Sequence, residues 1–410
     1  MTWSARHQTG AAILLAISIA DGARRLLSPR AKEIEPASVD LREYFSAAQI
    51  ERGSRYARPQ RALALARIVV DAGVLCLLVR TPPRQLSAGR QWPHPIASAA
   101  AAGAALTTGL TAPTLPLRVI SRRRAIAAGL DTQSWRGWAQ DLVKAGAIEA
   151  VFAGAGAAAI TAISRRYPKT WWAPAAAGSV AVGAGLAALA PVVLDPLFND
   201  FTPLPEGDTR ADVLTLADSA GVRVGEVYSV DASRRTTAAN AYVTGLGPTK
   251  RVVLFDTLLD RYSRDEVRVV VAHELGHVRH RDVIRGIAYA ALVAPAAAGA
   301  VQRLSWLLSP ARGNPAMLPA LALAAGLVRA PVGLLGNRLS RAIERRADAY
   351  SLELSDAPDA FVSFERTIAV QNVADLEPPR WVTALLATHP PTAERIGAAV
   401  AFGARKGAPG

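Results

Sequence analysis

Seven apolar runs, most of them close to the length that crosses a bilayer, constrain the fold of this 410-residue chain more than any other feature. A membrane-spanning helix needs about 20 consecutive apolar residues, and lipid offers its backbone no hydrogen-bond partners. The runs lie at residues 9–20, 63–79, 95–120, 145–163, 172–194, 283–301 and 316–335. We therefore expect a mainly α-helical, multi-pass membrane protein with about seven transmembrane helices.

The first of these runs has two interpretations. It is short, and Ser18, Ile19 and Ala20 are similar to the small-residue cleavage site of a secretory signal peptide. Arg24 and Arg25 follow it directly and favour a short membrane helix that stays in the protein. Cleavage of residues 1–20 remains the alternative.

The charge distribution indicates a membrane orientation. The chain is 51% hydrophobic and carries a net charge of +14, but its basic residues gather at the ends of apolar runs, as in Arg122, Arg123 and Arg124. Basic loops mark the cytoplasmic side, so we expect the polar segments described below to face the cytoplasm. No basic patch has interleaved aromatic residues, so no nucleic-acid partner is expected. The lone cysteine, Cys76, excludes a disulfide framework.

The composition changes at Asp195, where charged and turn-forming residues replace the apolar runs. The patterns that follow predict a soluble amphipathic helix at residues 208–221 and short strands at 222–230, 240–243 and 251–255. These elements indicate a small α+β unit that follows the membrane helices.

The strongest chemical motif is H-E-x-x-H, formed by His273, Glu274 and His277. On a helix the two histidines lie ~40° apart on one face, one turn above the other, where both imidazoles can bind one Zn²⁺. Glu274 points too far round the helix to be a ligand and is placed to act as a base on a water. Ser263 and Glu266 predict a capping box that starts this helix.

A third ligand is expected on a later helix, within N-R-L-S-R-A-I-E-R-R-A-D-A-Y (337–350). Glu344 would complete a His₂Glu site with one open position, which is typical of catalytic zinc. Asp348, four residues on, is on the same face and can accept the second N–H of a ligating histidine. An ordinary solvated helix face is the alternative for this segment.

Two further stretches are candidates for the site. Asn240 and Ala241 begin a short predicted strand, and an edge strand near a peptidase site can pair with an extended substrate. His389 and Arg395, in H-P-P-T-A-E-R, can stabilise the oxyanion of a tetrahedral intermediate if they lie near the metal. A plain strand and a helix-entry histidine are the alternatives.

Together these motifs resemble the type I CAAX prenyl endopeptidases, which are integral-membrane zinc metalloproteases. The resemblance is carried by H-E-L-G-H (273–277), S-R-A-I-E-R-R-A-D (340–348), N-A-Y-V-T-G (240–245), H-P-P-T-A-E-R (389–395) and D-P-L-F-N-D-F-T-P-L (195–204). It implies seven membrane helices that enclose a chamber, with the zinc site facing into it. It also implies Glu344 as ligand, Glu274 as base, Asp348 behind a ligand, Asn240 near substrate, and His389 and Arg395 around the scissile carbonyl.

The expected organisation is an N-terminal membrane domain (1–205) with about five membrane helices and a zinc metallopeptidase domain (206–410) that includes the runs at 283–301 and 316–335. The expected activity is zinc-dependent endopeptidase cleavage of membrane-associated or prenylated C-terminal peptides, with one Zn²⁺ per chain. A heat-shock type quality-control protease and a non-catalytic, zinc-bearing membrane scaffold are the alternatives. The expected location is the cell membrane, and the oligomeric state stays open.

Overall fold

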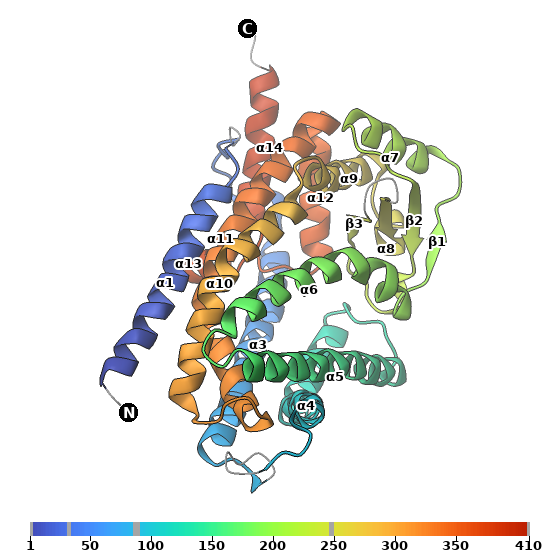
Figure 1. Cartoon of the computed structure of the whole chain (residues 1–410). Coiled ribbons are helices and arrows are strands. Elements are labelled where there is room, and N and C mark those ends of the chain that lie inside the picture. Colours follow the sequence, from blue (N-terminus) through green and yellow to red (C-terminus); the bar gives the residue numbers. More distant parts are fainter. Residues whose placement is uncertain (1–2, 31–33, 85–90, 246–249, 408–410) are drawn as a thin grey trace.

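The computed structural model describes residues 3–30, 34–84, 91–245 and 250–407. Seven long helices cover the seven predicted runs (Figure 1). They are α1 (Trp3–Leu27), α3 (Ala47–Arg80), α4 (Pro95–Ala127), α5 (Trp135–Arg166), α6 (Trp172–Val193), α10 (Asp282–Leu308) and α11 (Leu318–Ser355). The prediction of a mainly α-helical fold with a small sheet is therefore confirmed.

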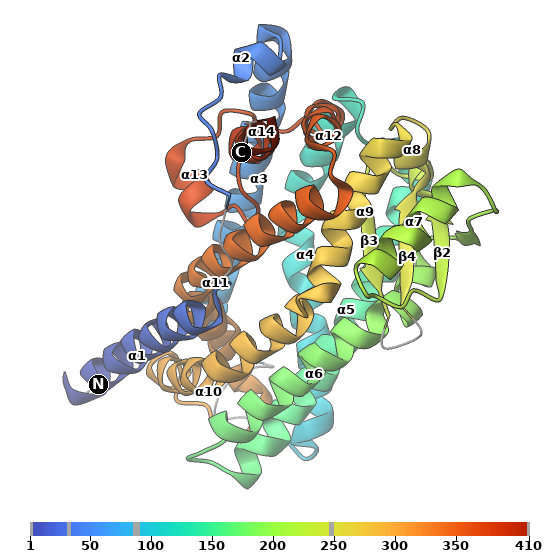
Figure 2. The same ribbon diagram turned by 90° about the horizontal axis from the view of Figure 1, so that it is seen from above.

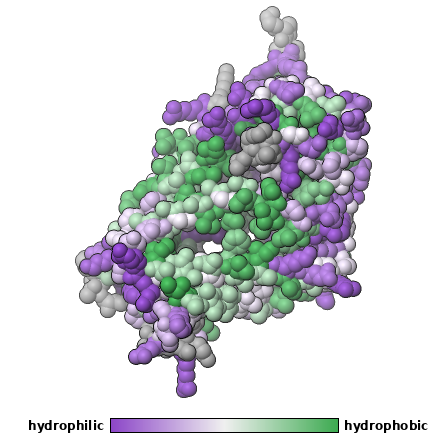
Figure 3. All heavy atoms as spheres, turned by 45° about the vertical axis from the view of Figure 1, so that its right-hand side comes forward, coloured by the Kyte–Doolittle hydropathy of each residue, from purple (hydrophilic) through white to green (hydrophobic). Residues whose placement is uncertain are grey.

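Five helical segments are long and apolar enough to cross a membrane: α3, α5, α6, α10 and the segment that contains α11. Neither α1 nor α4 is among them within the described residues, so the count of seven stays a prediction. The apolar windows of α3 and α6 are each only 6% buried. Figure 3 shows an apolar band between polar ends, hollowed between the helices. Such a surface suits contact with lipid.

Small residues bring the helices α4 and α5 into close contact. A Cβ added at Gly103 would lie 2.5 Å from the Ala157 Cβ and 2.7 Å from the Ala153 carbonyl oxygen. A Cβ added at Gly154 would likewise lie 3.0 Å from the Ala100 carbonyl oxygen. Helices in lipid associate largely through such backbone approach, because burial of apolar area adds little there.

The first helix lies along α10 and α11 (Figure 1). Its Ala16, Ala20 and Ala23 are buried against apolar residues of those two helices, among them Val293 and Val328. α1 is thus a packed part of the helical assembly.

The sheet has the strand order β1-β2-β4-β3, from β1 (Phe201–Pro203), β2 (Glu226–Val230), β4 (Arg251–Phe255) and β3 (Ala241–Thr244). β2 and β4 are parallel, and the two outer pairings are antiparallel. The strand predicted at 222–230 begins only at Glu226, and β1 was not predicted, since three residues ending in proline give no strand periodicity. The predicted boundary at residue 205 falls between β1 and the next helix and stays a prediction.

Shorter helices surround the sheet and the ends of the long helices. They are α2 (Leu41–Tyr44), α7 (Asp208–Ser219), α8 (Asp256–Leu259), α9 (Arg264–Arg279), α12 (Pro358–Gln371), α13 (Arg380–Leu385) and α14 (Thr392–Gly407). α7 and α9 share one apolar core with the sheet, which includes Val227, Leu254, Val271 and Leu275. The α9 helix therefore has a rigid support along its apolar face.

Of the two helices that carry the predicted ligands, α9 begins as predicted and α11 is longer than predicted. α9 starts with the predicted capping box: the Ser263 hydroxyl accepts from the Glu266 N–H, and the Glu266 carboxylate accepts from the Ser263 N–H. The 38-residue helix α11 joins the seventh apolar run to the polar segment that follows Asn337. One rod of about 57 Å thus connects the apolar band to the candidate metal site.

The α4–α5 contact generates a stability prediction. Alanine is the better helix former by about 1 kcal/mol, but at Gly103 its methyl group would collide with α5. We expect Gly103→Ala to lower the free energy of unfolding by about 1–3 kcal/mol. Gly109, on the same helix, has open space around it, so Gly109→Ala should be neutral or stabilising. Thermal unfolding of both variants in detergent tests this, and equal shifts in Tm would contradict the packing described.

Candidate metal centre

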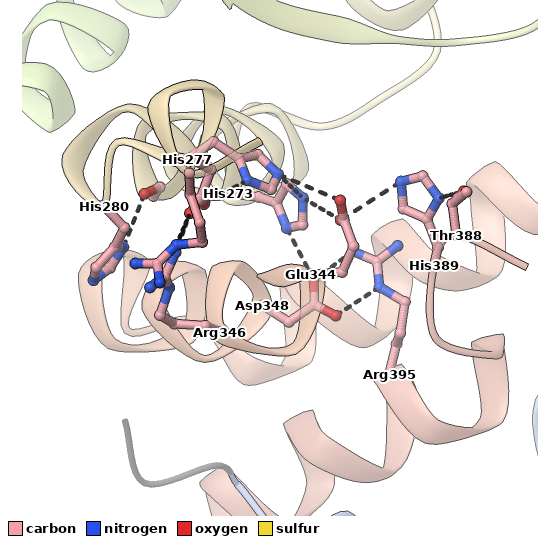
Figure 4. Close-up of polar contacts among 12 residues, drawn as sticks. His273, His277, His280, Glu344, Arg346, Asp348, Thr388, His389 and Arg395 are labelled. Atoms are coloured by element: carbon pink, nitrogen blue, oxygen red, sulfur yellow. Dashed lines mark hydrogen bonds and ion pairs between the residues drawn. The ribbon is translucent and has the colours of Figure 1, made fainter. Parts of the chain in front are cut away.

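Two helices face each other across the site. α9 presents His273 and His277 from one face, and α11 presents Glu344 and Asp348 from two successive turns of its own (Figure 4). His273, Glu344 and Asp348 are buried, with at most 8% of their surface exposed. The predicted residues from these two distant segments are thus brought together.

The ligand atoms have the separations that a tetrahedral metal requires. His273 Nε2 lies 3.2 Å from His277 Nε2 and 3.2 Å from Glu344 Oε2. His277 Nε2 lies 3.7 Å from Glu344 Oε1. Ligands held about 2.0–2.1 Å from a tetrahedral ion are about 3.3–3.4 Å apart. The two ring nitrogens and the Glu344 carboxylate therefore surround a point where one ion fits.

The polar atoms at this point also fit a cation. Glu344 Oε2 is buried and receives no hydrogen bond, which is costly for a carboxylate oxygen unless a positive charge lies beside it. Two neutral imidazoles and one carboxylate form a donor set that is typical of open catalytic zinc sites. His273, His277 and Glu344 are accordingly the residues that can hold a metal ion.

Each histidine is held by a carboxylate at its second nitrogen. His273 Nδ1 lies 2.9 Å from Asp348 Oδ1, and His277 Nδ1 lies 3.1 Å from Asp282 Oδ2. A proton on Nδ1 would face the carboxylate in each case and leave Nε2 free for the metal. The first was predicted and the second was not. Asp282 reaches back because Arg281 has a left-handed backbone (φ 56°) that turns the chain after α9, and nothing in the sequence marks that turn.

Glu274 lies beside the two histidines. One of its carboxylate oxygens is within 4.8 Å of a ligand atom on each of them, as expected for a base that reaches a water near the metal. Burial raises the pKa of the Glu274 carboxyl above its usual range, while His273 and His277 act in the opposite direction. A raised pKa suits a group that must both accept and return a proton.

Arg395 occupies the far side of Asp348. Its Nε and Nη2 donate to the two Asp348 oxygens at 2.9 and 2.6 Å, and its Nη1 lies 2.5 Å from Glu365 Oε1. Glu365 was not predicted, because α12 shows no motif around it. It is fully buried, and burial raises its pKa to about 7. The chain from Glu365 through Arg395 and Asp348 ends on His273 and fixes that ring.

His389 approaches the site from the opposite side. Its Nε2 lies 3.5 Å from Glu344 Oε2, and the Thr388 hydroxyl lies 3.0 Å from its Nδ1. If the hydroxyl donates to Nδ1, the ring keeps its proton on Nε2, which faces the site (Figure 4). The side chain is 63% exposed, so it can meet a substrate.

The predicted substrate strand is an edge of the sheet. β3 pairs only with β4 among the described residues, and it lies against α9 (Figure 2). The Asn240 carbonyl accepts from the Phe255 N–H at 3.1 Å, while the Asn240 side chain is exposed. Ala241 is buried in the core of the sheet. It can therefore contact a peptide only through its main-chain N–H and C=O groups.

Family models match both halves of the chain. Residues 203–402 match the model of peptidase family M48, and residues 30–200 match the model described as the CAAX prenyl protease N-terminal part with five membrane helices. Metalloprotease YhfN of Bacillus subtilis, described as uncharacterized, is 32% identical over 292 residues, which are 69% of this chain and 68% of that protein.

Other relatives match over less of their length. A CAAX prenyl protease 1 homolog of Oryza sativa subsp. japonica is 32% identical over 51% of this chain and 51% of its own. CAAX prenyl protease 1 of Saccharomyces cerevisiae is 41% identical over 25% and 23%. The chain thus spans about half or less of these relatives.

The crystal structure of S. mikatae Ste24p shares the fold, with a TM-score of 0.75 and 20% identity over 97% of this chain and 100% of that one. A multi-pass membrane protein is indicated by three findings that agree: the match to the N-terminal family model, the five candidate spans and the shared fold. The M48 match covers every residue of the candidate metal centre, from His273 to Arg395. The chain therefore belongs to the CAAX prenyl protease family of membrane metalloproteases within peptidase family M48.

Proposed function

We propose that this metalloprotease uses zinc, held by His273, His277 and Glu344, to hydrolyse internal peptide bonds. The observation that carries the proposal is the convergence of both histidine Nε2 atoms and the Glu344 carboxylate. The two nitrogens are 3.2 Å apart, His273 Nε2 lies 3.2 Å from Glu344 Oε2, and His277 Nε2 lies 3.7 Å from Glu344 Oε1. Zinc in a His₂Glu site polarises a carbonyl group and lowers the pKa of a bound water to ~7.

Other side chains near the metal site transfer protons, stabilise the oxyanion and hold the ligands in place. Glu274 accepts the proton of the attacking water and passes it to the leaving amine. His389 Nε2–H donates to the oxygen of the scissile carbonyl as negative charge develops there. Arg395 was predicted for the same task, but its Nε, Nη1 and Nη2 all contact carboxylates. We assign it the task of holding Asp348, and through it His273.

The substrate class follows from the edge strand and from the relatives. An extended peptide can add to β3 beside Asn240 and Ala241, with main-chain hydrogen bonds that do not depend on sequence. Relatives are named CAAX prenyl proteases, and we propose membrane-associated or prenylated C-terminal peptides as substrates, met from the cytoplasmic side. A quality-control protease that cleaves unprenylated membrane proteins is the second candidate.

The base role predicts the outcome of one substitution. Glu274→Gln keeps the shape of the side chain but removes its basicity, so turnover should fall by about 10²–10⁴-fold while zinc stays bound. Cleavage of a fluorogenic peptide and zinc content by mass spectrometry measure the two effects. Asp265→Asn, on the exposed first turn of α9, is the matched control. A zinc-loaded Glu274→Gln enzyme with full activity would refute the assignment.

The carboxylate behind His277 predicts a loss of metal affinity. Asp282→Asn removes the charge that favours the Nδ1–H tautomer, so zinc affinity should fall by about 10–100-fold. Competition with a chromogenic chelator measures it. Asp260→Asn, at an exposed position before α9, should have no effect. An unchanged zinc affinity in Asp282→Asn would show that the contact has no part in metal binding.

Metal removal separates the enzyme from a zinc-bearing scaffold. A chelator should abolish peptide cleavage, and added zinc should restore it. A scaffold would show no cleavage in either state. Capture of bound peptides with Glu274→Gln in membranes, read by mass spectrometry, then distinguishes the substrate classes: recovery of prenylated tails supports the first, and recovery of unprenylated membrane proteins alone supports quality control.

A further inference from the structure

A second cavity lies away from the metal centre, where the polar ends of α3 and α12 meet the loop before α9. It has a volume of about 590 Å³, within the range of small-molecule sites. Three arginines from distant segments line it: Arg52 of α3, Arg261 before α9, and Arg366 of α12. No carboxylate is among its lining residues.

The charges of these arginines are uncompensated. In the described part of the chain, no ion pair joins Arg52, Arg261 or Arg366 to a carboxylate. Arg52 donates through Nη2 to the Ala128 carbonyl at 2.8 Å, and Arg366 through Nε to the Tyr44 carbonyl at 3.0 Å. These bonds orient two guanidinium groups without neutralising them. All three residues are exposed, so water screens part of their mutual repulsion, and an anion between them would be attracted by three like charges at once.

The wall of the cavity also contacts the start of the metal-binding helix. Ser363 and Thr367 line the cavity, and their hydroxyls contact Glu266 Oε1 at 2.7 and 3.4 Å. Glu266 is the residue that closes the capping box of α9 through its bond to the Ser263 N–H. A ligand that draws Arg261 and Arg366 together therefore acts on the first turn of α9.

We propose that this cavity binds the phosphate group of an anionic ligand and that the bound ligand stabilises the N-terminal end of α9. Guanidinium groups match phosphate oxygens through paired, charge-assisted hydrogen bonds. The proposal concerns a site separate from the catalytic one and does not depend on the substrate.

The distance of the cavity from the membrane-spanning part of α3 favours a water-soluble phosphate ester over a phospholipid. Arg52 precedes Leu63, where the apolar run of α3 begins, by about 16 Å along the helix. The headgroup layer on each side of a bilayer is only about 5–7 Å thick. A phosphate ester in solution therefore reaches the cavity more readily than a phospholipid headgroup, and the experiment below distinguishes the two.

The test uses the full-length, zinc-loaded protein in detergent. Inorganic phosphate or glycerol phosphate, compared with sodium chloride at equal ionic strength, should raise Tm and protect the amides at the start of α9 from hydrogen exchange. Arg261→Gln and Arg366→Gln should each weaken phosphate binding by about tenfold or more. Arg223→Gln, an exposed arginine outside the cavity, should bind as the unaltered protein does.

A second arm uses nanodiscs of phosphatidylcholine with and without phosphatidylglycerol. If phosphatidylglycerol stabilises the protein, soluble phosphate does not, and Arg261→Gln loses the effect, the phosphate group belongs to a lipid and the cavity is still its binding site. No stabilisation in either arm would overturn the proposal. Equal stabilisation of the unaltered protein, Arg261→Gln and Arg366→Gln would overturn it as well, because binding would then not involve the cavity.

Discussion

The contact between α9 and α11 combines an apolar part, which includes Leu275 and Leu352, with a buried group of charged and titratable side chains. Histidines one turn apart on α9 meet carboxylates one turn apart on α11, and His273 touches both Glu344 and Asp348. The apolar face of α9 is fixed by the core of the sheet, and the other half of α11 lies among the long apolar helices. Together with the chain from α9 into α10, this contact joins the polar part of the molecule to the long helices.

Buried carboxylates at this contact need positive charge around them. On one side Arg395 lies between Asp348 and Glu365, and on the other Arg346 pairs with Asp282 behind His277. A divalent ion held by His273, His277 and Glu344 would supply positive charge beside Glu344. Loss of Arg395 would leave both Asp348 and Glu365 without their arginine in the interior. Asp282, in contrast, would keep Arg285 and His277 as neighbours if Arg346 were lost.

The sequence alone predicted the part of the site that depends on local periodicity. The H-E-x-x-H spacing, the capping box at Ser263 and the four-residue step from Glu344 to Asp348 follow from helix geometry, and the structure shows all three. The apolar runs likewise predicted the long helices, because their length is set by the bilayer rather than by tertiary packing.

Asp282 and Glu365 could not be predicted, because they act through the turn at Arg281 and the docking of α12. The arginine-lined cavity could not be predicted either, because its three arginines are each more than a hundred residues from the next along the chain. Contacts of this kind are properties of the folded chain, and no periodicity within any one segment carries them. The strand β1 was missed for a simpler reason, its length of three residues.

The continuity of α11 has a mechanical consequence. From Val328, packed among the long helices, to Glu344 the helix rises about 24 Å, with Pro331 near the start of this stretch. A rod of that length that leans by about 5° displaces its end by about 2 Å, which is comparable to a bond between a ligand and a metal. Helices in lipid change their lean to match the thickness of the bilayer. The position of Glu344 relative to His273 and His277 is thus mechanically coupled to the membrane in which the protein sits.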